Sequence, residues 1–225
     1  LFCIGYNTVM STQRKFNKKF FKKWSSDMAY ILGFLFADGN IIKTKRGTHF
    51  VGWYSSDFEL IGSMAQSMSS NHKISKRSGG YVLQIGSKEL FNDLVTLGLT
   101  PNKARRMQLP KIPQKYVGHF IRGYFDGDGN VWSGYVNKDR ENPTYILSTS
   151  FTSASRNFLQ GLKNLLEKEN LIGGCIYDIK GKKCSRLQYG AVNALKLFKI
   201  MYNGTHSLFL ARKKAVFDKF IKMRP

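Results

Sequence analysis

The stretch Ala29-Tyr-Ile-Leu-Gly-Phe-Leu-Phe-Ala-Asp-Gly-Asn-Ile41 has a second, related copy in this chain, Phe120-Ile-Arg-Gly-Tyr-Phe-Asp-Gly-Asp-Gly-Asn-Val131. Each copy is an apolar helical stretch that ends in Asp-Gly-Asn and an aliphatic residue. The final aspartates of the two copies, Asp38 and Asp128, lie 90 residues apart. The repeat predicts a chain built of two related halves.

The similarity continues downstream of both copies. Leu83-Gln-Ile-Gly86 and Leu187-Gln-Tyr-Gly190 each precede a helical pattern that ends in a glycine. These two segments lie 104 residues apart, so the second half carries about 14 extra residues. We expect the extra residues in a polar loop at 136–143.

Each half is predicted to run α-β-β-α-β-β-α, which is an α+β fold class. In the first half we expect strands at 40–46, 48–55, 72–77 and 81–86, and helices at 57–69 and 87–97 that begin at the N-caps Asp57 and Ser87. In the second half we expect strands at 130–137, 144–151, 175–180 and 185–189, and helices at 155–169, 191–202 and 207–222. The predicted organisation is a basic N-terminal extension over 1–24, an N-terminal half over 25–110 and a C-terminal half over 111–225, with a linker at 106–114.

Small residues in both repeats predict that the two repeat helices pack together. Gly33 and Ala37 are four residues apart, and so are Gly123 and Gly127. Residues at this spacing share a helix face, and small side chains there let two helices approach closely. The C-terminal ends of the helices would then meet.

The meeting of the two helix ends would bring Asp38 and Asp128 side by side. Two adjacent carboxylates repel each other unless one takes a proton or a cation neutralises them. Divalent cations favour oxygen ligands, and such a site suits phosphodiester hydrolysis. A turn after a helix would explain one Asp-Gly-Asn copy but not two equivalent ones. A calcium loop starting at Asp126 is excluded, because its sixth residue is Val131 and its twelfth is Asn137.

The segments Ile31-Leu-Gly-Phe-Leu-Phe-Ala-Asp-Gly39 and Ile121-Arg-Gly-Tyr-Phe-Asp-Gly-Asp-Gly129 resemble the LAGLIDADG motif. Two copies in one chain resemble the monomeric, pseudo-symmetric branch of the LAGLIDADG homing endonucleases. The resemblance implies a site-specific double-strand DNA endonuclease whose halves each present a saddle-shaped antiparallel sheet to DNA. It also implies Mg²⁺ as cofactor, or another divalent cation such as Mn²⁺, with Ca²⁺ in a non-cleaving complex.

The resemblance assigns roles to particular residues. The metal-binding acids would be Asp38 and Asp128, and the preceding backbone carbonyls of Ala37 and Gly127 would add ligands. The basic residue near the scissile phosphate would be Lys103 in the first half and Lys213 in the second. Ordinary phosphate contacts or solvated surface positions are the alternatives for both lysines.

Four further residues depart from the motif or match the family weakly. The sixth motif position is Phe36 in the first copy and Asp126 in the second. We therefore expect Asp126 to be structural. Ser55 and Ser153 fall where the family often has a water-orienting side chain.

The charge balance independently predicts a nucleic-acid partner. Lys and Arg number 36 against 14 Asp and Glu, which gives a net charge of +22. Residues 1–110 carry 16 basic and 6 acidic side chains, and residues 111–225 carry 20 and 8. Both halves are therefore built to face a polyanion such as DNA. A membrane surface is the competing partner, but the longest apolar run, at 28–37, is too short to span a bilayer.

The expected setting is intracellular, in the cytoplasm of a prokaryote or in an organelle, with no secretion signal. The cysteines Cys3, Cys175 and Cys184 show no zinc-binding spacing. Cys175 and Cys184 could face each other across a hairpin, but we expect reduced thiols in the core.

Strand alternation selects the side chains expected to face DNA, because a two-stranded ribbon fits the major groove. Core-facing residues would be Tyr81, Leu83, Ile85, Leu187 and Tyr189. The predicted DNA-binding residues are Lys43, Lys45, Arg46, Lys73, Ser75, Arg77, Gln84, Lys138, Arg140, Lys180, Lys182, Lys183, Arg186 and Gln188. The two halves differ at nearly all these positions, which predicts an asymmetric target. The basic stretch 14–23 either tracks the DNA backbone or is disordered.

A second class of function remains open. A non-catalytic nucleic-acid-binding member of the family, such as an intron RNA maturase, would carry the same fold, although both acids are present here. We expect an intron-encoded enzyme that acts as a monomer on double-stranded DNA, with RNA possible but not favoured. An intein-embedded enzyme is not expected, because the ends of the chain show no splicing residues.

Overall fold

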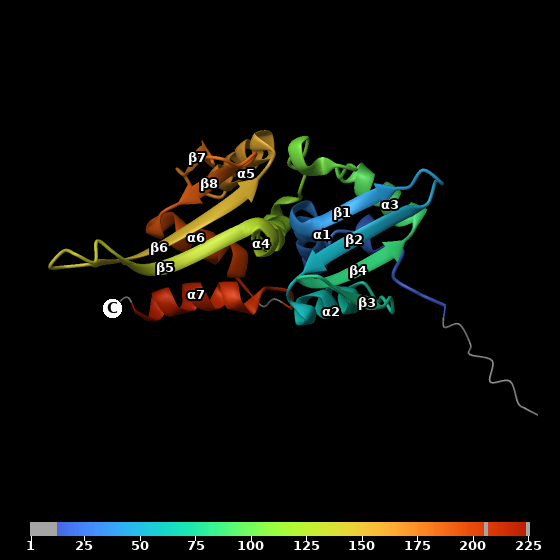
Figure 1. The fold of residues 1–225 in the computed structure, drawn as a ribbon, viewed down its shortest axis with the longest axis horizontal. Helices are drawn as coiled ribbons and strands as arrows, with labels where there is room; N and C mark the ends of the chain where they lie inside the picture. The colour runs from blue at the N-terminus through green and yellow to red at the C-terminus, as the bar shows by residue number, and fades with distance from the viewer. Residues whose placement is uncertain (1–12, 205–206, 224–225) are drawn as a thin grey trace, which may run out of the picture.

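The computed structural model describes residues 13–204 and 207–223, in which two related halves lie side by side (Figure 1). The N-terminal half consists of α1 (Ser26–Asp38), β1 (Gly39–Lys43), β2 (His49–Ser55), α2 (Phe58–Ser67), β3 (Ile74–Arg77), β4 (Gly80–Gly86) and α3 (Lys88–Thr96). The C-terminal half consists of α4 (Val117–Asp128), β5 (Gly129–Val136), β6 (Thr144–Ser153), α5 (Arg156–Lys168), β7 (Cys175–Asp178), β8 (Ser185–Tyr189), α6 (Ala191–Tyr202) and α7 (Ala211–Lys222). Three single turns of 3-10 helix are η1 (Phe20–Lys22), η2 (Lys103–Arg105) and η3 (Gln114–Tyr116). The α+β prediction and the order α-β-β-α-β-β-α are confirmed. The last predicted helix, at 207–222, is present as α7 and begins at Ala211.

Each half contains one four-stranded antiparallel sheet, with the strand orders β1-β2-β4-β3 and β5-β6-β8-β7. In β4, Leu83 and Ile85 are fully buried while Gln84 between them is exposed. In β8, Leu187 and Tyr189 are buried in the same way. The apolar face of each sheet therefore packs on the helices, and the opposite face is open. This is the orientation that alternation predicts for both strands.

Helices α1 and α4 pack against each other in the middle of the molecule, between the two sheets (Figure 1). A Cβ atom on Gly33 would lie 2.1 Å from the carbonyl oxygen of Phe120, and one on Gly123 would lie 2.0 Å from that of Tyr30. No side chain fits at such distances, so glycine is required at both positions. The close packing predicted from the four-residue spacing is confirmed.

The extra residues of the second half are divided between two places. Gly39 pairs with Trp53, 14 residues later, whereas Gly129 pairs with Phe151, 22 residues later. The hairpin of β5 and β6 therefore holds eight of the extra residues and projects from the end of the molecule (Figure 1). The remaining six lie between β6 and β8, because Trp53 pairs with Leu83 and Phe151 with Leu187. The prediction that a single loop at 136–143 holds all of them is wrong.

The described part of the N-terminal extension packs on the N-terminal half. Phe21 is buried, and Phe16, Phe20 and Trp24 pack against the core. The backbone N–H of Asn17 donates to the carbonyl of Met68 at 2.8 Å. Of the two alternatives for the stretch 14–23, disorder is therefore wrong. Residues 1–12 lie outside the described residues.

The helix starts agree with the predicted caps, while one strand ends early. The side chains of Asp57 and Ser87 accept N–H groups from the first turns of α2 and α3. The strand predicted over 40–46 ends at Lys43, because Thr44 and Thr48 close a turn in which Gly47 has a φ of +82°. Lys45 and Arg46 lie in this turn.

The described cysteines do not lie where the sequence predicts. Cys175 is exposed and Cys184 is half-buried, so the prediction that these thiols lie in the core is wrong, and both are free. Cys3 lies outside the described residues. Within 13–204 and 207–223, none of the helices has the length and apolar character needed to cross a membrane.

Candidate active site

The aspartates at the ends of α1 and α4 lie next to each other. A Cβ atom on Gly127 would lie 2.4 Å from the Cβ of Ala37 and 3.5 Å from the carboxylate Oδ2 of Asp38. Asp38 is exposed and Asp128 is half-buried. Burial, followed by the charge of Asp38, raises the pKa of the Asp128 carboxyl from 3.8 to about 6. The two helix ends thus hold a pair of carboxylates that repel each other, as the small residues of the repeat predict.

Lys103 closes the site from the N-terminal half. It begins η2, directly after Asn102, which adopts a left-handed backbone with a φ of +55°. Its ammonium Nζ donates to the carbonyls of Phe36 at 2.5 Å and Ala37 at 2.8 Å. Burial lowers its pKa to about 8, against the attraction of the Asp128 and Asp38 carboxylates. Two of its three N–H donors therefore satisfy carbonyls that α1 leaves unpaired at its C-terminus.

Lys213 occupies the matching place in the C-terminal half, on the first turn of α7. It is buried, and its Nζ lies 2.7 Å from the carbonyl of Phe125, 2.9 Å from that of Asp126 and 2.6 Å from that of Gly129. The carbonyl of Gly127 is 3.4 Å away. Burial lowers the pKa of Lys213 to about 8. All three N–H donors thus point into the C-terminal end of α4.

The donor set of this site suits a hard divalent cation. It offers two carboxylates and the carbonyls of Ala37 and Gly127, which are the oxygen ligands that Mg²⁺ and Ca²⁺ prefer. The protein supplies only part of a coordination shell, since no group of three His, Cys, Asp or Glu side chains comes together in the described part of the chain. Mg²⁺ is commonly held by one or two carboxylates together with phosphate and water. Because each carbonyl also accepts from a lysine, the carboxylates are the stronger ligands.

The fold and this site can be compared with known proteins. Residues 115–201 match the family model of the LAGLIDADG-like domain. The structure is similar to that of the I-SmaMI LAGLIDADG homing endonuclease bound to cleaved DNA, with a TM-score of 0.58 and 15% identity over 87% of each chain. The chain has the LAGLIDADG homing endonuclease fold.

Other solved structures share this LAGLIDADG fold. I-SmaMI bound to an uncleaved DNA target in the presence of calcium ions has a TM-score of 0.60, with 14% identity over 89% of this chain and 90% of that chain. Mesophilic variants of the homing endonuclease I-DmoI give a TM-score of 0.56, with 17% identity over 80% of this chain and 97% of that chain. At such low identity, these likenesses show the fold and not the activity of this chain.

The curated relatives that this chain matches are longer proteins. The probable translation initiation factor IF-2 of Methanocaldococcus jannaschii is 28% identical over 170 residues, which are 72% of this chain and 13% of that protein. The protein of the same description from Thermococcus kodakarensis is 28% identical over 151 residues, which are 64% of this chain and 12% of that protein. This chain thus spans about an eighth of the length of the curated relatives it matches.

The open faces of the two sheets carry many of the side chains predicted to face DNA. On the first sheet, Gln84 lies opposite Gly52 and Ser75 lies opposite Val82, on the face away from the buried Leu83. Lys73, Ser75, Arg77 and Gln84 together line one pocket with Arg14. On the second sheet, Arg186 pairs with Thr152 and Gln188 with Ser150 on the corresponding open face. The predicted lysines and arginines at 45–46, 138–140 and 180–183 lie in the turns beside the sheets.

One predicted DNA contact lies on the wrong face of its strand. Lys43 pairs with His49 and has the same alternation as Ile41 and Val51, which are buried. The side chains of β1 that face outward are instead Asn40 and Ile42. Lys43 thus belongs to the helix-covered side of the sheet, where it is exposed at the strand end.

Several large side chains on the open faces are absent from the predicted DNA contacts, which are charged, amide or hydroxyl residues. Ile42 and Tyr54 are 42% and 39% exposed on the first sheet, and Trp132 and Tyr177 are 46% and 39% exposed on the second. The alternation that identifies Gln84 and Gln188 also identifies these residues, since an apolar side chain on a solvent-facing strand position has no core to fill. In a DNA interface such side chains contact thymine methyl groups.

The expectation for the two strand-end serines is wrong. Ser55 and Ser153 are 8% and 5% exposed and lie on the core-facing side of β2 and β6. The hydroxyl of Ser55 accepts the N–H of Asp57 at 3.0 Å, and that of Ser153 accepts the N–H of Ser155 at 3.1 Å. These serines hold the turns from strand to helix and do not orient a water at the aspartates.

Proposed function

We propose that this protein is a site-specific endonuclease that hydrolyses one phosphodiester on each strand of a long double-stranded DNA target with a divalent cation, Mg²⁺ in the first instance. The observation that carries the proposal is the pair Asp38 and Asp128 at the meeting helix ends, flanked by the lysine ammonium groups of the two halves. The fold supports a nuclease. That the protein cleaves DNA, and that it needs a divalent cation to do so, is what we propose.

The aspartates and the lysines of the site would have different roles in phosphodiester hydrolysis. Asp38 and Asp128 would hold the cation at the point where both strands are cut, with the Ala37 and Gly127 carbonyls as further ligands. A cation bound there would polarise the phosphate and lower the pKa of a bound water. Lys103 keeps one N–H beyond its two carbonyl partners, and this donor would stabilise the negative charge that develops on a phosphate oxygen. Lys213, whose N–H donors are all taken by carbonyls, would serve the other strand through its positive charge.

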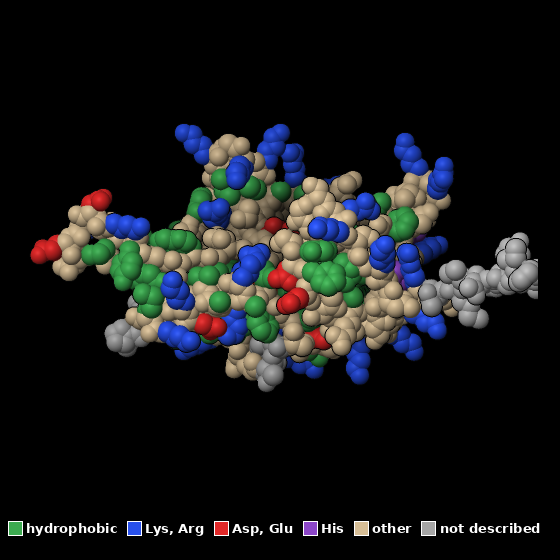
Figure 2. Space-filling view, turned by 60° about the horizontal axis from the view of Figure 1, so that its bottom comes forward, with side chains coloured by type: hydrophobic (Ala, Val, Ile, Leu, Met, Phe, Trp, Pro, Cys, Tyr) green, Lys and Arg blue, Asp and Glu red, His purple; other side chains and the backbone are tan. Residues whose placement is uncertain are grey.

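The surface of the molecule supports DNA as the partner. On the face seen in Figure 2, Lys and Arg side chains project from both halves, and acidic side chains are fewer. A protein that neutralises many phosphates releases their counterions, so binding is expected to weaken steeply with salt. Because its proposed substrate is DNA, we expect the protein to act inside a cell or an organelle.

The target is proposed to be asymmetric and bound by a single chain. Matched positions on the two open faces hold different side chains, with Val82 against Arg186 and Ile42 against Trp132. Two matched pairs stay the same, Gln84 with Gln188 and Asn40 with Asn130. Base contacts from such different faces read different sequences.

The proposal is tested by incubating the full chain with a plasmid library of randomised sites in Mg²⁺ or in EDTA. Cleavage is expected in Mg²⁺ only and is expected to be lost in Asp38→Asn and Asp128→Asn. Asp57→Asn is the matched control, because asparagine caps α2 as well as aspartate does. If the wild-type chain binds DNA or structured RNA tightly in EDTA but cuts nothing in Mg²⁺, the protein is a non-catalytic nucleic-acid-binding member and the proposal is wrong.

A further inference from the structure

The two halves of the site differ two residues before the metal-binding aspartates. The N-terminal half has Phe36 there, and the C-terminal half has Asp126. Asp126 is a buried carboxyl group, with 3% of its surface exposed, in the interface of α1 and α4. It does not face the proposed metal site, so its presence in only one half requires another explanation.

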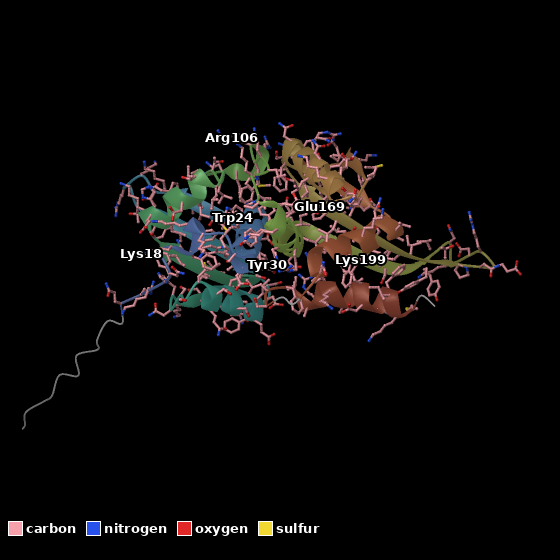
Figure 3. The ribbon with its side chains drawn as sticks, turned by 180° about the vertical axis from the view of Figure 1, so that it is seen from behind. Lys18, Trp24, Tyr30, Arg106, Glu169 and Lys199 are labelled. Carbon is pink, nitrogen blue, oxygen red and sulfur yellow. The ribbon has the colours of Figure 1, made fainter. Side chains whose placement is uncertain are left out.

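The contacts of Asp126 lead to the segment before α7. Its Oδ2 accepts a hydrogen bond from the Tyr30 hydroxyl of α1 at 2.7 Å and another from the backbone N–H of Leu210 at 2.8 Å. Tyr30 lies in the centre of the molecule, where the halves meet (Figure 3). Leu210 is the N-cap residue of α7, and Lys213 follows three residues later. A single carboxylate oxygen thus joins α1, α4 and the start of the helix that carries Lys213.

A second side chain of α4 fixes the same segment. Arg122 is buried, and its Nε donates to the carbonyl of Leu208 at 2.9 Å while its Nη1 donates to that of Met201 at 2.6 Å. The chain from the end of α6 to the start of α7 is therefore attached to α4 by hydrogen bonds at three backbone positions. This attachment holds Lys213 at the carbonyl end of the same helix.

Among the residues that the structure describes, no carboxylate accepts a hydrogen bond from the segment that carries Lys103. Lys103 lies on a single turn of 3-10 helix in the connection between the halves, between the buried Leu99 and Met107. A polar contact that holds this segment comes from the Ser155 hydroxyl, which donates to the carbonyl of Met107 at 2.6 Å. The two lysines therefore occupy matched places but depend on different anchors.

We propose that Asp126 is a positioning residue that sets Lys213 through the N–H of Leu210, so that cleavage of one DNA strand depends on Asp126 and cleavage of the other does not. The inference rests on the proposed endonuclease function. Asp126 touches neither substrate nor cation and acts through the placement of α7. Displacing a catalytic group by about 1 Å costs on the order of 100-fold in rate, so a strand-selective loss of about 10- to 100-fold is expected.

The experiment measures the cleavage rate of each strand separately, on a selected target that carries a different label at each 5′ end. Asp126→Ala removes both hydrogen bonds and is expected to slow the same strand as Lys213→Met, leaving DNA affinity in Ca²⁺ unchanged and nicked DNA as the main product. Lys103→Met is expected to slow the opposite strand. Asp126→Asn keeps an acceptor oxygen for Leu210 and is expected to restore cleavage of both strands.

Tyr30→Phe separates the two bonds of Asp126. It removes the donor from α1 but leaves the Leu210 bond, so the ratio of the two strand rates is expected to stay close to that of the wild type. If Asp126→Ala does not fold, Asp126→Glu, which moves the acceptor oxygen, makes the same comparison. An equal loss on both strands would overturn the inference while leaving the endonuclease proposal intact. A wild-type chain that cuts neither strand would instead overturn the endonuclease proposal itself.

Discussion

Replacing Asp128 by asparagine is expected to stabilise the metal-free protein at neutral pH while abolishing cleavage. Burial and the Asp38 carboxylate raise the pKa of Asp128 from 3.8 to about 6. At 1.36 kcal/mol per pH unit, the ionised carboxyl costs the folded state about 3 kcal/mol. Allowing for the solvent that reaches this half-buried group, we expect about 2 kcal/mol. Asparagine carries no charge and avoids this cost.

The difference in unfolding free energy between Asp128→Asn and the wild type is expected to grow as the pH rises. Because the folded-state pKa lies above that of the unfolded chain, the protonated carboxyl stabilises the fold in acid, and this stabilisation is lost as the pH rises from about 4 to about 6. The wild type and Asp128→Asn should therefore have similar free energies of unfolding near pH 4 and differ fully by pH 7. In a chain of this size, about 2 kcal/mol corresponds to about 4–8 °C in Tm.

The assay is urea unfolding in EDTA at pH 4.5 and pH 7.5, with Asp57→Asn as the control for the same chemical change at a helix N-cap. Excess Mg²⁺ should narrow the gap at pH 7.5, because a cation that binds only the folded wild type stabilises it. If Asp128→Asn is no more stable than the wild type at pH 7.5, the Asp38 and Asp128 carboxylates do not repel each other in the folded protein.

Three other predictions follow from the packing and the surface. Gly123→Ala is expected to destabilise the fold by about 3 kcal/mol in urea unfolding, because its Cβ would lie 2.0 Å from the Tyr30 carbonyl. Gly62→Ala is the control, because Gly62 lies in α2 with open space around it, and this variant should be neutral or stabilising by up to about 1 kcal/mol. An equal loss of unfolding free energy in Gly123→Ala and Gly62→Ala would contradict the close contact of α1 and α4. Trp132→Ala should relax base preference at one or two target positions by about 1 kcal/mol each in site selection while keeping the cutting rate on the preferred site, and an unchanged preference would remove Trp132 from the interface. Binding of Mg²⁺ at pH 5.5 should release a proton, seen by calorimetry in two buffers, and Asp128→Asn should lose this release; if it does not, the proton comes from another group.

The features that could be predicted from the sequence depend on local or repeated patterns. The duplication of Asp38 as Asp128, with a glycine five residues before each aspartate, is sufficient to predict that two helices meet with their aspartates together. Alternation in β4 and β8 predicts their buried and open faces, because each strand is regular over its whole length.

The features that could not be predicted depend on contacts between segments that are distant in the chain. Lys43 could not be placed, because Ile41 and Ile42 are both apolar and only the pairing of β1 with β2 decides which of them is buried. The link from Asp126 to Leu210 spans 84 residues, and no periodic pattern reports it. The division of the extra residues between a hairpin and the region after β6 is set by the register of strand pairing, which a difference in length does not reveal.

The central claim is that Asp38 and Asp128 form one metal-dependent site that cuts both strands. The most direct measurement is selection of cleaved sites from a randomised DNA library in Mg²⁺, followed by mapping of both ends, for the wild type and Asp128→Asn in parallel. If the two aspartates form this site, the wild type yields a single asymmetric target cut at one position on each strand. Asp128→Asn then yields no cleaved sites while still binding that target. Cleavage by Asp128→Asn at the rate of the wild type, or by the wild type in EDTA, would contradict this claim.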